Sequence, residues 1–550
     1  MFSTADWLLR LKRTYIGNAT ATRDMRIQLR GSRAAVLFTL YLFVMGGVLL
    51  LFYNSSMGGY AAESLATAQS RLQEFYYETL VSLGIVITIA APSMGAFAIV
   101  TEKQRRSLDL VFSAPTEPKY YLVGKLIGSF RYVWLLLVLS LPICAVSVTL
   151  GGATWGQLFL TFLQFSFYGL VCASFGLLLS TLCSKVLPAI IWTYLAVGCY
   201  FIVTFLLLGV TSGFSGSPFT QVNPFGSLNP IAFPFAADQT WPVFGHEVPT
   251  WILSIVLQLC IVKFLILAAG SLIAPGNSKE IRGLRVHGLI YIGALAFLVG
   301  FSMDPALRTM LPYTTTSTSV TVKTALQIFH GRSVFILLFV LGMIIVPYLS
   351  SFGFNDLRRH RPNGFFNIRH ILSGRPSGHL PYLLLLFATC VAAYAWGVAS
   401  APTAMAFRRF GGPTTVSSIE VLDPFSTSFL MFVLLALDIW LIAFLLGWFS
   451  VSRVPLLSRG RTISLFFFVL ALILPTALFA IVDGGSVETA SGIWAVNPLT
   501  STFCGVEVAG IAGLHSLALL CLCVILALAT IPNVAKQSAR ILEKPTEAPQ

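Results

Sequence analysis

Charged residues are scarce in this sequence. Only 10% of its 550 residues are Asp, Glu, Lys or Arg, and 56% are hydrophobic, whereas a soluble globular protein carries roughly 25% charged residues. The composition therefore excludes an ordinary soluble domain. It predicts an all-α, polytopic integral membrane protein.

Signatures of catalysis are also missing. The nine cysteines contain no CxxC pair and the seven histidines no HExxH motif, so we expect neither a disulfide framework nor a metal site. No GxSxG elbow and no GxxxxGK[ST] phosphate loop is found, and the one Gly-Lys pair, Gly124-Lys125, lacks the earlier glycine. We expect a chain that is not an enzyme and holds no cofactor.

Long apolar stretches are abundant, and about 20 such residues suffice to cross a bilayer as a helix. Twelve segments qualify: 34–54, 79–100, 121–149, 157–182, 187–210, 251–274, 287–302, 331–352, 381–401, 425–450, 462–483 and 511–532. Of the segments between them, 55–78 predicts a short helix that leads into the second span. Residues 211–250, rich in Gly, Pro, Phe and Ser, predict a folded cap instead of a strand domain.

The basic residues indicate the orientation of these spans. With both termini cytoplasmic, the inner segments hold 27 of the 35 Lys and Arg residues, as the positive-inside rule requires. The formal net charge of +14 is then explained by membrane topology, and no nucleic-acid partner is expected. We expect no cleaved signal, because a 33-residue basic segment precedes the first span, and we place the chain in the cytoplasmic (inner) membrane.

The spans divide into two sets of six. The predicted parts are a cytoplasmic interface segment (1–33), a first half (34–274), a linker (275–286), a second half (287–532) and a tail (533–550). Each half has a basic inner loop after its second span, at 101–120 and 353–380, and Asn-Pro recurs at Asn229-Pro230 and Asn497-Pro498. A diverged repeat would let one chain form the whole pathway. Otherwise a second copy or a related permease must complete it.

The polar stretch 101–126 separates the second and third spans. Leu108, Val111 and Phe112 share one helical face, Ala114-Pro115 should end that helix, and Thr116-Glu117-Pro118 should begin the next one. A helix, a bend and a helix are expected on the cytoplasmic side. By physics alone, the stretch could equally be a connector that lies on anionic headgroups.

Motif residues in two places suggest a family. The polar stretch contains Glu102, Arg105, Ser107, Leu108, Asp109, Leu110, Val111, Pro115, Gly124 and Lys125, and the segment before the first span contains Asn18, Arg23, Asp24, Met25, Arg26, Leu29, Arg30 and Arg33. This pattern resembles the type-2 ABC-transporter permease family, which includes permeases linked to copper-enzyme maturation and gliding motility. The chain has Arg106 where glycine is usual and Ala19 where proline is common.

The resemblance implies a permease subunit of an ABC exporter, moved by a separate cytoplasmic ATPase that binds ATP and Mg. Residues 102–118 would be the coupling helix seated in a groove of that ATPase. The residues expected to carry this coupling are Glu102, Arg105, Arg106, Ser107, Leu108, Asp109, Val111, Phe112 and Pro115. The sequence does not specify a transported substrate.

Arg23, Arg26, Arg30 and Arg33 recur at helical spacing. They predict an interface helix along the membrane surface. This helix would either anchor the chain to lipid alone or anchor it to lipid and also contact the ATPase.

Lys263 and Asp438 are the ionisable residues nearest the middle of apolar spans, where a charge costs about 2.5–3.5 kcal/mol. We expect them to pair across the bundle. The alternative is that Lys263 snorkels while Asp438 is protonated or hydrogen-bonded. The sequence also allows two other functions. An ion-coupled secondary transporter would depend on Lys263 and Asp438, and a membrane assembly factor would transport nothing.

Overall fold

In a computed structural model the chain forms two compact units, Met1–Ala274 and Pro275–Gln550. Each unit is described by itself. The structure describes residues 18–29, 32–57, 65–106, 118–150, 153–211, 222, 226–243, 246–273, 278–302, 368–372, 378–400 and 521.

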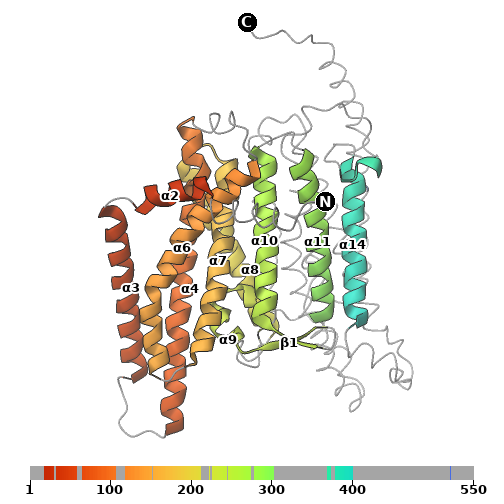
Figure 1. Cartoon of the computed structure of the whole chain (residues 1–550). Coiled ribbons are helices and arrows are strands. Elements are labelled where there is room, and N and C mark those ends of the chain that lie inside the picture. The colour runs from red at the N-terminus through yellow and green to blue at the C-terminus, as the bar shows by residue number, and fades with distance from the viewer. Residues whose placement is uncertain are drawn as a thin grey trace, which may run out of the picture. The chain divides into compact units, whose positions relative to one another are not determined.

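Helices make up nearly all of the described first unit (Figure 1). They are α2 (Ala19–Leu29), α3 (Ser32–Met57), α4 (Leu65–Gln104), α6 (Pro118–Thr149), α7 (Trp155–Leu182), α8 (Val186–Thr211), α9 (Phe233–Ala236) and α10 (Thr250–Ile273). Four described helices are long and apolar enough to cross a membrane, namely those over 69–104, 119–149, 155–182 and 250–273. Shorter apolar helical stretches lie in α3, in α8 and, in the second unit, at Pro381–Gly397.

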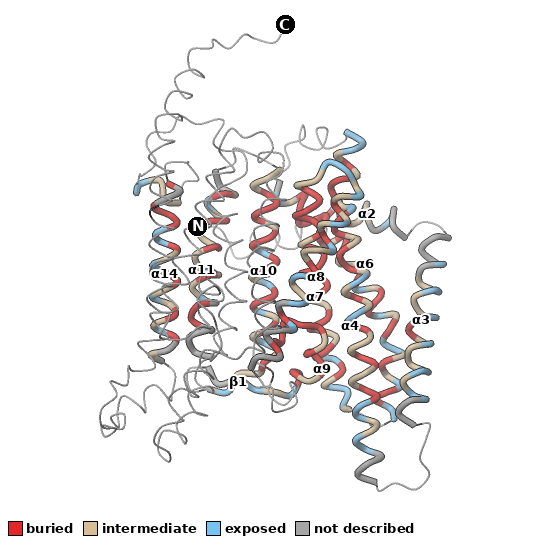
Figure 2. The backbone as a smooth tube through the Cα atoms, turned by 180° about the vertical axis from the view of Figure 1, so that it is seen from behind, coloured by how far each residue is buried: buried red, intermediate tan, exposed pale blue. Residues whose placement is uncertain are grey.

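Helices therefore occupy eight of the twelve predicted spans. Of the other four, 331–352, 425–450 and 462–483 lie outside the described residues, and residue 521 is the one described residue of 511–532. The short helix expected before the second span is continuous with it, because α4 runs for 40 residues with Pro92 inside. Only Met45 is buried among the described side chains of α3 (Figure 2), so this apolar helix exposes most of its surface, as a lipid-facing helix does.

Helices α4 and α7 form the tightest contact of the first unit. A Cβ atom at Gly95 would collide with the carbonyl oxygen of Ala173, and one at Gly176 would lie 2.6 Å from the carbonyl oxygen of Pro92. Small residues let transmembrane helix backbones approach in this way. The buried cluster beside this contact includes Leu83, Ile87, Val133, Phe165, Tyr168 and Cys172.

The described part of segment 212–249 packs against one end of the bundle (Figure 1). It contains two 3-10 turns, η2 (Gly226–Leu228) and η3 (Pro230–Ala232), then α9 and a hairpin of β1 (Thr240–Val243) with β2 (His246–Pro249). Asn229 caps η3 through Ile231 N and donates to Phe201 O of α8 at 2.9 Å. Phe233 packs edge-on against Phe165. The prediction of a folded cap fits these contacts, but the sequence did not indicate the hairpin.

The described second unit contains α11 (Ser278–Ser302), η5 (Ile368–His370) and α14 (His379–Ser400). Helix α11 begins within the predicted linker, so residues 278–286 are helical. It packs along α14, where Gly293 faces Thr389 and Phe297 contacts Trp396.

Candidate functional site

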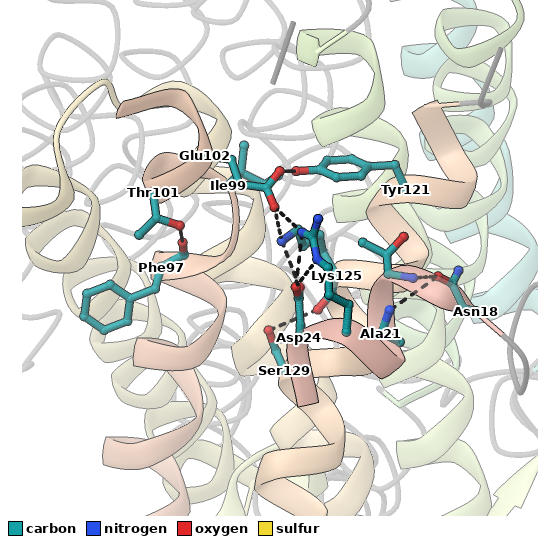
Figure 3. A network of polar contacts seen from close by, with 12 residues as sticks. Asn18, Ala21, Asp24, Phe97, Ile99, Thr101, Glu102, Tyr121, Lys125 and Ser129 are labelled. Atoms are coloured by element: carbon teal, nitrogen blue, oxygen red, sulfur yellow. Dashed lines mark hydrogen bonds and ion pairs between the residues drawn. The ribbon is translucent and has the colours of Figure 1, made fainter. Parts of the chain in front are cut away.

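Three helices meet where α4 ends and α6 begins (Figure 3). Helix α2 crosses this end of the bundle and packs on α6 (Figure 1). Each helix contributes charge: Arg23 and Asp24 come from α2, Glu102 from the last turn of α4, and Lys125 from the second turn of α6. We call these residues the four-charge cluster.

Lys125 and Glu102 lie at the centre of the cluster. Lys125 Nζ is 2.8 Å from Asp24 Oδ2 and 2.6 Å from Glu102 Oε1, and the Arg23 guanidinium is 2.6 Å from the same Glu102 oxygen. Tyr121, one turn before Lys125, donates its hydroxyl to Glu102 Oε2 at 2.5 Å. A single carboxylate at the end of α4 is therefore bonded to both α2 and α6.

The cluster is balanced in charge and mostly buried. The exposed fraction is 5% for the Lys125 side chain, 11% for Glu102, 15% for Asp24 and 53% for Arg23. Removing buried charges from water is costly unless they are paired, and here two cations face two carboxylates. Desolvation lowers the pKa of Arg23, but Asp24 and Glu102 raise that pKa by more, so the guanidinium stays charged and holds the outer edge of the cluster.

Asn18 fits the start of α2 against α6. Its Oδ1 accepts from the N2 and N3 backbone amides of α2, as an N-cap does. Its Nδ2 donates to the carbonyl of Tyr120 at 3.1 Å. A Cβ atom at position 124 would collide with this side-chain amide. The Gly-Lys pair is thus explained: Gly124 leaves room for Asn18, and the next residue, Lys125, binds the carboxylates.

The opposite side of α4 is fixed to α7. Ser180 Oγ accepts from two consecutive backbone amides of α4, at 2.9 Å and 2.8 Å. Lys103 Nζ donates to the carbonyl of Thr181 and lies 3.5 Å from that of Cys183. These carbonyls end α7, where a cation is favoured by the helix dipole. The end of α4 is therefore held by α2 and α6 on one side and by α7 on the other.

Three of the nine predicted coupling residues are among the described residues, and the other six are not. Glu102 belongs to the four-charge cluster, and Arg105 and Arg106 are exposed in the turn that follows α4. Arg106 has a φ of 54°, in the left-handed region that glycine adopts without strain, which accounts physically for the glycine usual at this position in the resembling family. Six predicted residues lie outside the described residues: Ser107, Leu108, Asp109, Val111, Phe112 and Pro115.

The predicted interface helix is shorter than its four arginines suggest. Arg23 and Arg26 lie on α2, whereas Arg33 lies on α3, which begins at Ser32. Arg33 therefore does not share the α2 face, and Arg30 lies outside the described residues. Ala19, at the first position of α2, places its backbone amide 3.4 Å from the Tyr120 hydroxyl, a bond that proline could not form.

The predicted pair of Lys263 and Asp438 stays a prediction. Lys263 is exposed on α10, and Asp438 lies outside the described residues.

Sequence reasoning missed the central role of Lys125. Asn18, Asp24 and Lys125 are motif residues to which the sequence alone assigns no site role. Asn18 and Asp24 lie in the motif that ends at Arg33, and Lys125 lies in the motif that begins at Glu102. Membership in these two motifs was the signal that could have joined them. Tyr121 carried no signal, because a tyrosine at the start of an apolar span is common in membrane helices.

The described part of the chain contains no group of three or more His, Cys, Asp or Glu side chains that could hold a metal ion. The geometry of the four-charge cluster is that of a structural connection between helices. Each of its charges is bonded to protein, and its bonds connect helices that flank residues 107–117.

Part of the chain matches a known protein family. Residues 53–272 match the model of the ABC-2 family transporter protein family. Searches of curated proteins and of solved structures found no match. The family match supports the resemblance to type-2 ABC-transporter permeases, and it covers α4 to α10 together with the segment between α4 and α6.

Proposed function

We propose, from the match of residues 53–272 to the ABC-2 transporter family, that this chain is the permease subunit of an ATP-driven exporter in the cytoplasmic membrane. Twelve spans with both termini inside fit its apolar stretches and the distribution of its basic residues. Since the sequence has no phosphate loop, ATP and Mg would be bound by a separate ATPase subunit. Substrate would cross the membrane when that ATPase closes.

The four-charge cluster is the observation that carries this proposal. Residues 107–117 connect α4 to α6, and Glu102 bonds to Tyr121 and Lys125 across the two ends of that connection. A force on residues 107–117 would therefore move the ends of α4 and α6 together instead of separating them. Because α2 is bonded to the same carboxylate through Arg23, it would move with them.

Contacts within the bundle would transmit this movement. The end of α4 is bonded to α7 through Ser180 and Lys103, and the two helices touch backbone to backbone at Gly95 and Gly176. Protein interiors are close-packed and transmit strain over such contacts. A push at the inner end of α4 should therefore displace α7 as well.

Reconstitution tests the proposal. The full chain would be purified in mild detergent from its native membrane, and any bound ABC ATPase would be identified by mass spectrometry. We expect the ATP turnover of that ATPase to increase when the chain is present in lipid nanodiscs. Charge reversal of the exposed pair, Arg105→Glu with Arg106→Glu, should abolish the increase, while the matched variant Arg105→Lys with Arg106→Lys should retain it.

Two results would refute the proposal. One is the absence of an ABC ATPase across several mild detergents and nanodiscs. The other is transport that follows a proton or sodium gradient without ATP, as expected of an ion-coupled secondary transporter.

A further inference from the structure

Two glutamines in the membrane-spanning helices of the first unit are buried without full hydrogen bonding. Gln164 on α7 and Gln258 on α10 are both 0% exposed. Within the part of the chain that the structure describes, neither amide atom of Gln164 has a hydrogen-bond partner, and neither does Gln258 Oε1. Gln258 Nε2 donates to Ser254 Oγ at 3.4 Å, and that hydroxyl donates to the carbonyl of Ser227 at 2.7 Å. Most of the hydrogen-bonding capacity of the two carboxamides is therefore unused.

The two glutamines lie at the same level on neighbouring helices. Helix α7 packs on α10 (Figure 1). Near the starts of these helices, Gln157 and Thr250 bond to consecutive residues of the segment between α9 and β1, so the two starts are level. Gln164 lies seven residues beyond Gln157, or roughly 10 Å along the helix axis. Gln258 lies eight residues beyond Thr250, or roughly 12 Å.

The charges on these helices favour a neutral ligand. Helix α7 contains no Asp, Glu, Lys or Arg, and the one charged residue of α10, Lys263, is exposed. An ion buried between the helices would therefore meet no buried opposite charge on either of them, and an unpaired buried charge is very costly. A carboxamide both donates and accepts hydrogen bonds. A hydroxyl or an amide, which also does both, matches the two glutamines.

The side chains around Gln258 favour an apolar remainder of that ligand. Leu257 and Ile261, beside Gln258 on α10, are buried. The exposed face of the same turns is also apolar, with Val256 at 52% and Leu259 at 43% exposed. Helix α10 therefore offers apolar contacts both inside the bundle and on the surface that faces lipid. A neutral polar group attached to an apolar tail fits these surroundings.

We propose that Gln164 and Gln258 bind the uncharged hydroxyl or amide head group of an amphiphilic substrate, whose tail contacts the apolar side chains of α10. This inference rests on the proposed function and names the substrate class. Each carboxamide would donate to and accept from the head group. The ligand would thereby satisfy buried polar atoms whose desolvation is otherwise uncompensated.

Photolabelling of the full chain in lipid nanodiscs tests this site. The probes would be diazirine-bearing alkyl chains of equal length that end in an alcohol, a carboxylate, a quaternary ammonium or a methyl group. We expect the alcohol to label peptides of α7 and α10, identified by mass spectrometry, far more than the other probes do. Gln164→Leu and Gln258→Leu should each reduce labelling by the alcohol about tenfold, which is the effect of one hydrogen bond of ordinary strength.

Thermal unfolding separates ligand binding from a structural role. Because the amide atoms of Gln164 have no partner among the described residues, Gln164→Leu should leave the unfolding temperature unchanged or raise it. The matched control is Gln157→Leu on the same helix. Gln157 bonds to Asp238 and accepts from the Thr154 amide, so this variant should unfold at a lower temperature but keep its labelling by the alcohol.

Several results would overturn the site. One is equal labelling by all the probes, and another is unchanged labelling by the alcohol in both leucine variants. Leucine variants that unfold at lower temperature and keep their labelling would show that the glutamines only hold the helices together. Photolabelling needs no ATPase, so each of these results would leave the proposed permease function standing.

ATP turnover distinguishes a substrate from a resident lipid. With the co-purified ABC ATPase present, the alcohol probe should stimulate ATP turnover, and Gln164→Leu with Gln258→Leu should abolish that stimulation. A probe that labels the site without stimulating turnover would overturn the substrate assignment. Absence of any ABC ATPase would refute the proposed function, and the substrate assignment with it, while photolabelling would still decide whether the glutamines bind a neutral head group.

Discussion

Replacing Lys125 by methionine tests the four-charge cluster most directly. The substitution keeps the length of the side chain and removes its charge, which leaves Asp24 and Glu102 facing Arg23 alone. Breaking a buried ion pair from one side costs about 3–5 kcal/mol. Because Arg23 is 53% exposed and already lies 2.6 Å from Glu102, it can compensate in part, and we expect about 3 kcal/mol. That corresponds to roughly a hundredfold shift in the folding equilibrium.

Substitutions at Arg23 and Glu102 provide comparisons for this free-energy cost. Arg23→Met should cost only about 0–1 kcal/mol, since a half-exposed ion pair is screened by solvent. Lys125→Met combined with Glu102→Gln removes one charge of each sign and leaves Arg23 with Asp24. We therefore expect the double variant to be more stable than the sum of the single variants predicts, by about 0.5–3 kcal/mol.

Equilibrium unfolding in mixed micelles would measure these free energies, and ATPase stimulation in nanodiscs would measure coupling. The matched control is Lys185→Met, an exposed lysine in the turn between α7 and α8, which should change stability by less than about 0.5 kcal/mol. Equal losses in the Lys125 and Lys185 variants would refute the cluster as a buried joint. A destabilised Lys125→Met protein with full ATPase stimulation would refute its role in coupling.

Three further substitutions probe the contacts around the cluster, each measured by the same unfolding assay. Gly95→Ala should destabilise by about 1–3 kcal/mol, because its new methyl group meets the carbonyl of Ala173; an unchanged stability would contradict the close α4 to α7 contact. Asn18→Ala should cost about 1 kcal/mol through loss of the α2 cap, and hydrogen exchange of α2 should rise; unchanged exchange would count against it. Arg106→Gly should stabilise by about 1 kcal/mol by relieving a left-handed backbone, whereas a loss of stability would contradict that conformation.

Much of the helical architecture follows from local sequence. Each predicted span within the described residues coincides with a helix, because a long apolar run satisfies both the membrane and its own backbone hydrogen bonds. Helix α11 begins earlier than its apolar run, since its first turns are charged and hydropathy alone does not detect them. The hairpin of β1 and β2 is too short to leave a periodic pattern.

The candidate site was less predictable. Motif residues identified Asn18, Asp24, Glu102 and Lys125 separately, but their mutual contacts depend on how α2 packs on α6, and apolar periodicity does not encode that packing. The expectation of one helix with four arginines failed at Arg33, because spacing alone does not show where α2 ends and α3 begins. Arg285 is one of the 27 basic residues that the sequence assigns to inner segments, and its burial depends on bonds to the carbonyls of His370 and Ile371, more than 80 residues away.

Helix α4 extends unequal distances on the two sides of its close contact with α7. Its close contact with α7 at Gly95 lies 9 residues from Gln104 but 30 residues from Leu65. At about 1.5 Å per residue these arms measure roughly 14 Å and 45 Å. If α4 tilts about that contact, each ångström of travel at the end near Glu102 becomes about 3 Å at the far end. A small displacement on one side of the membrane would in this way become a larger opening on the other.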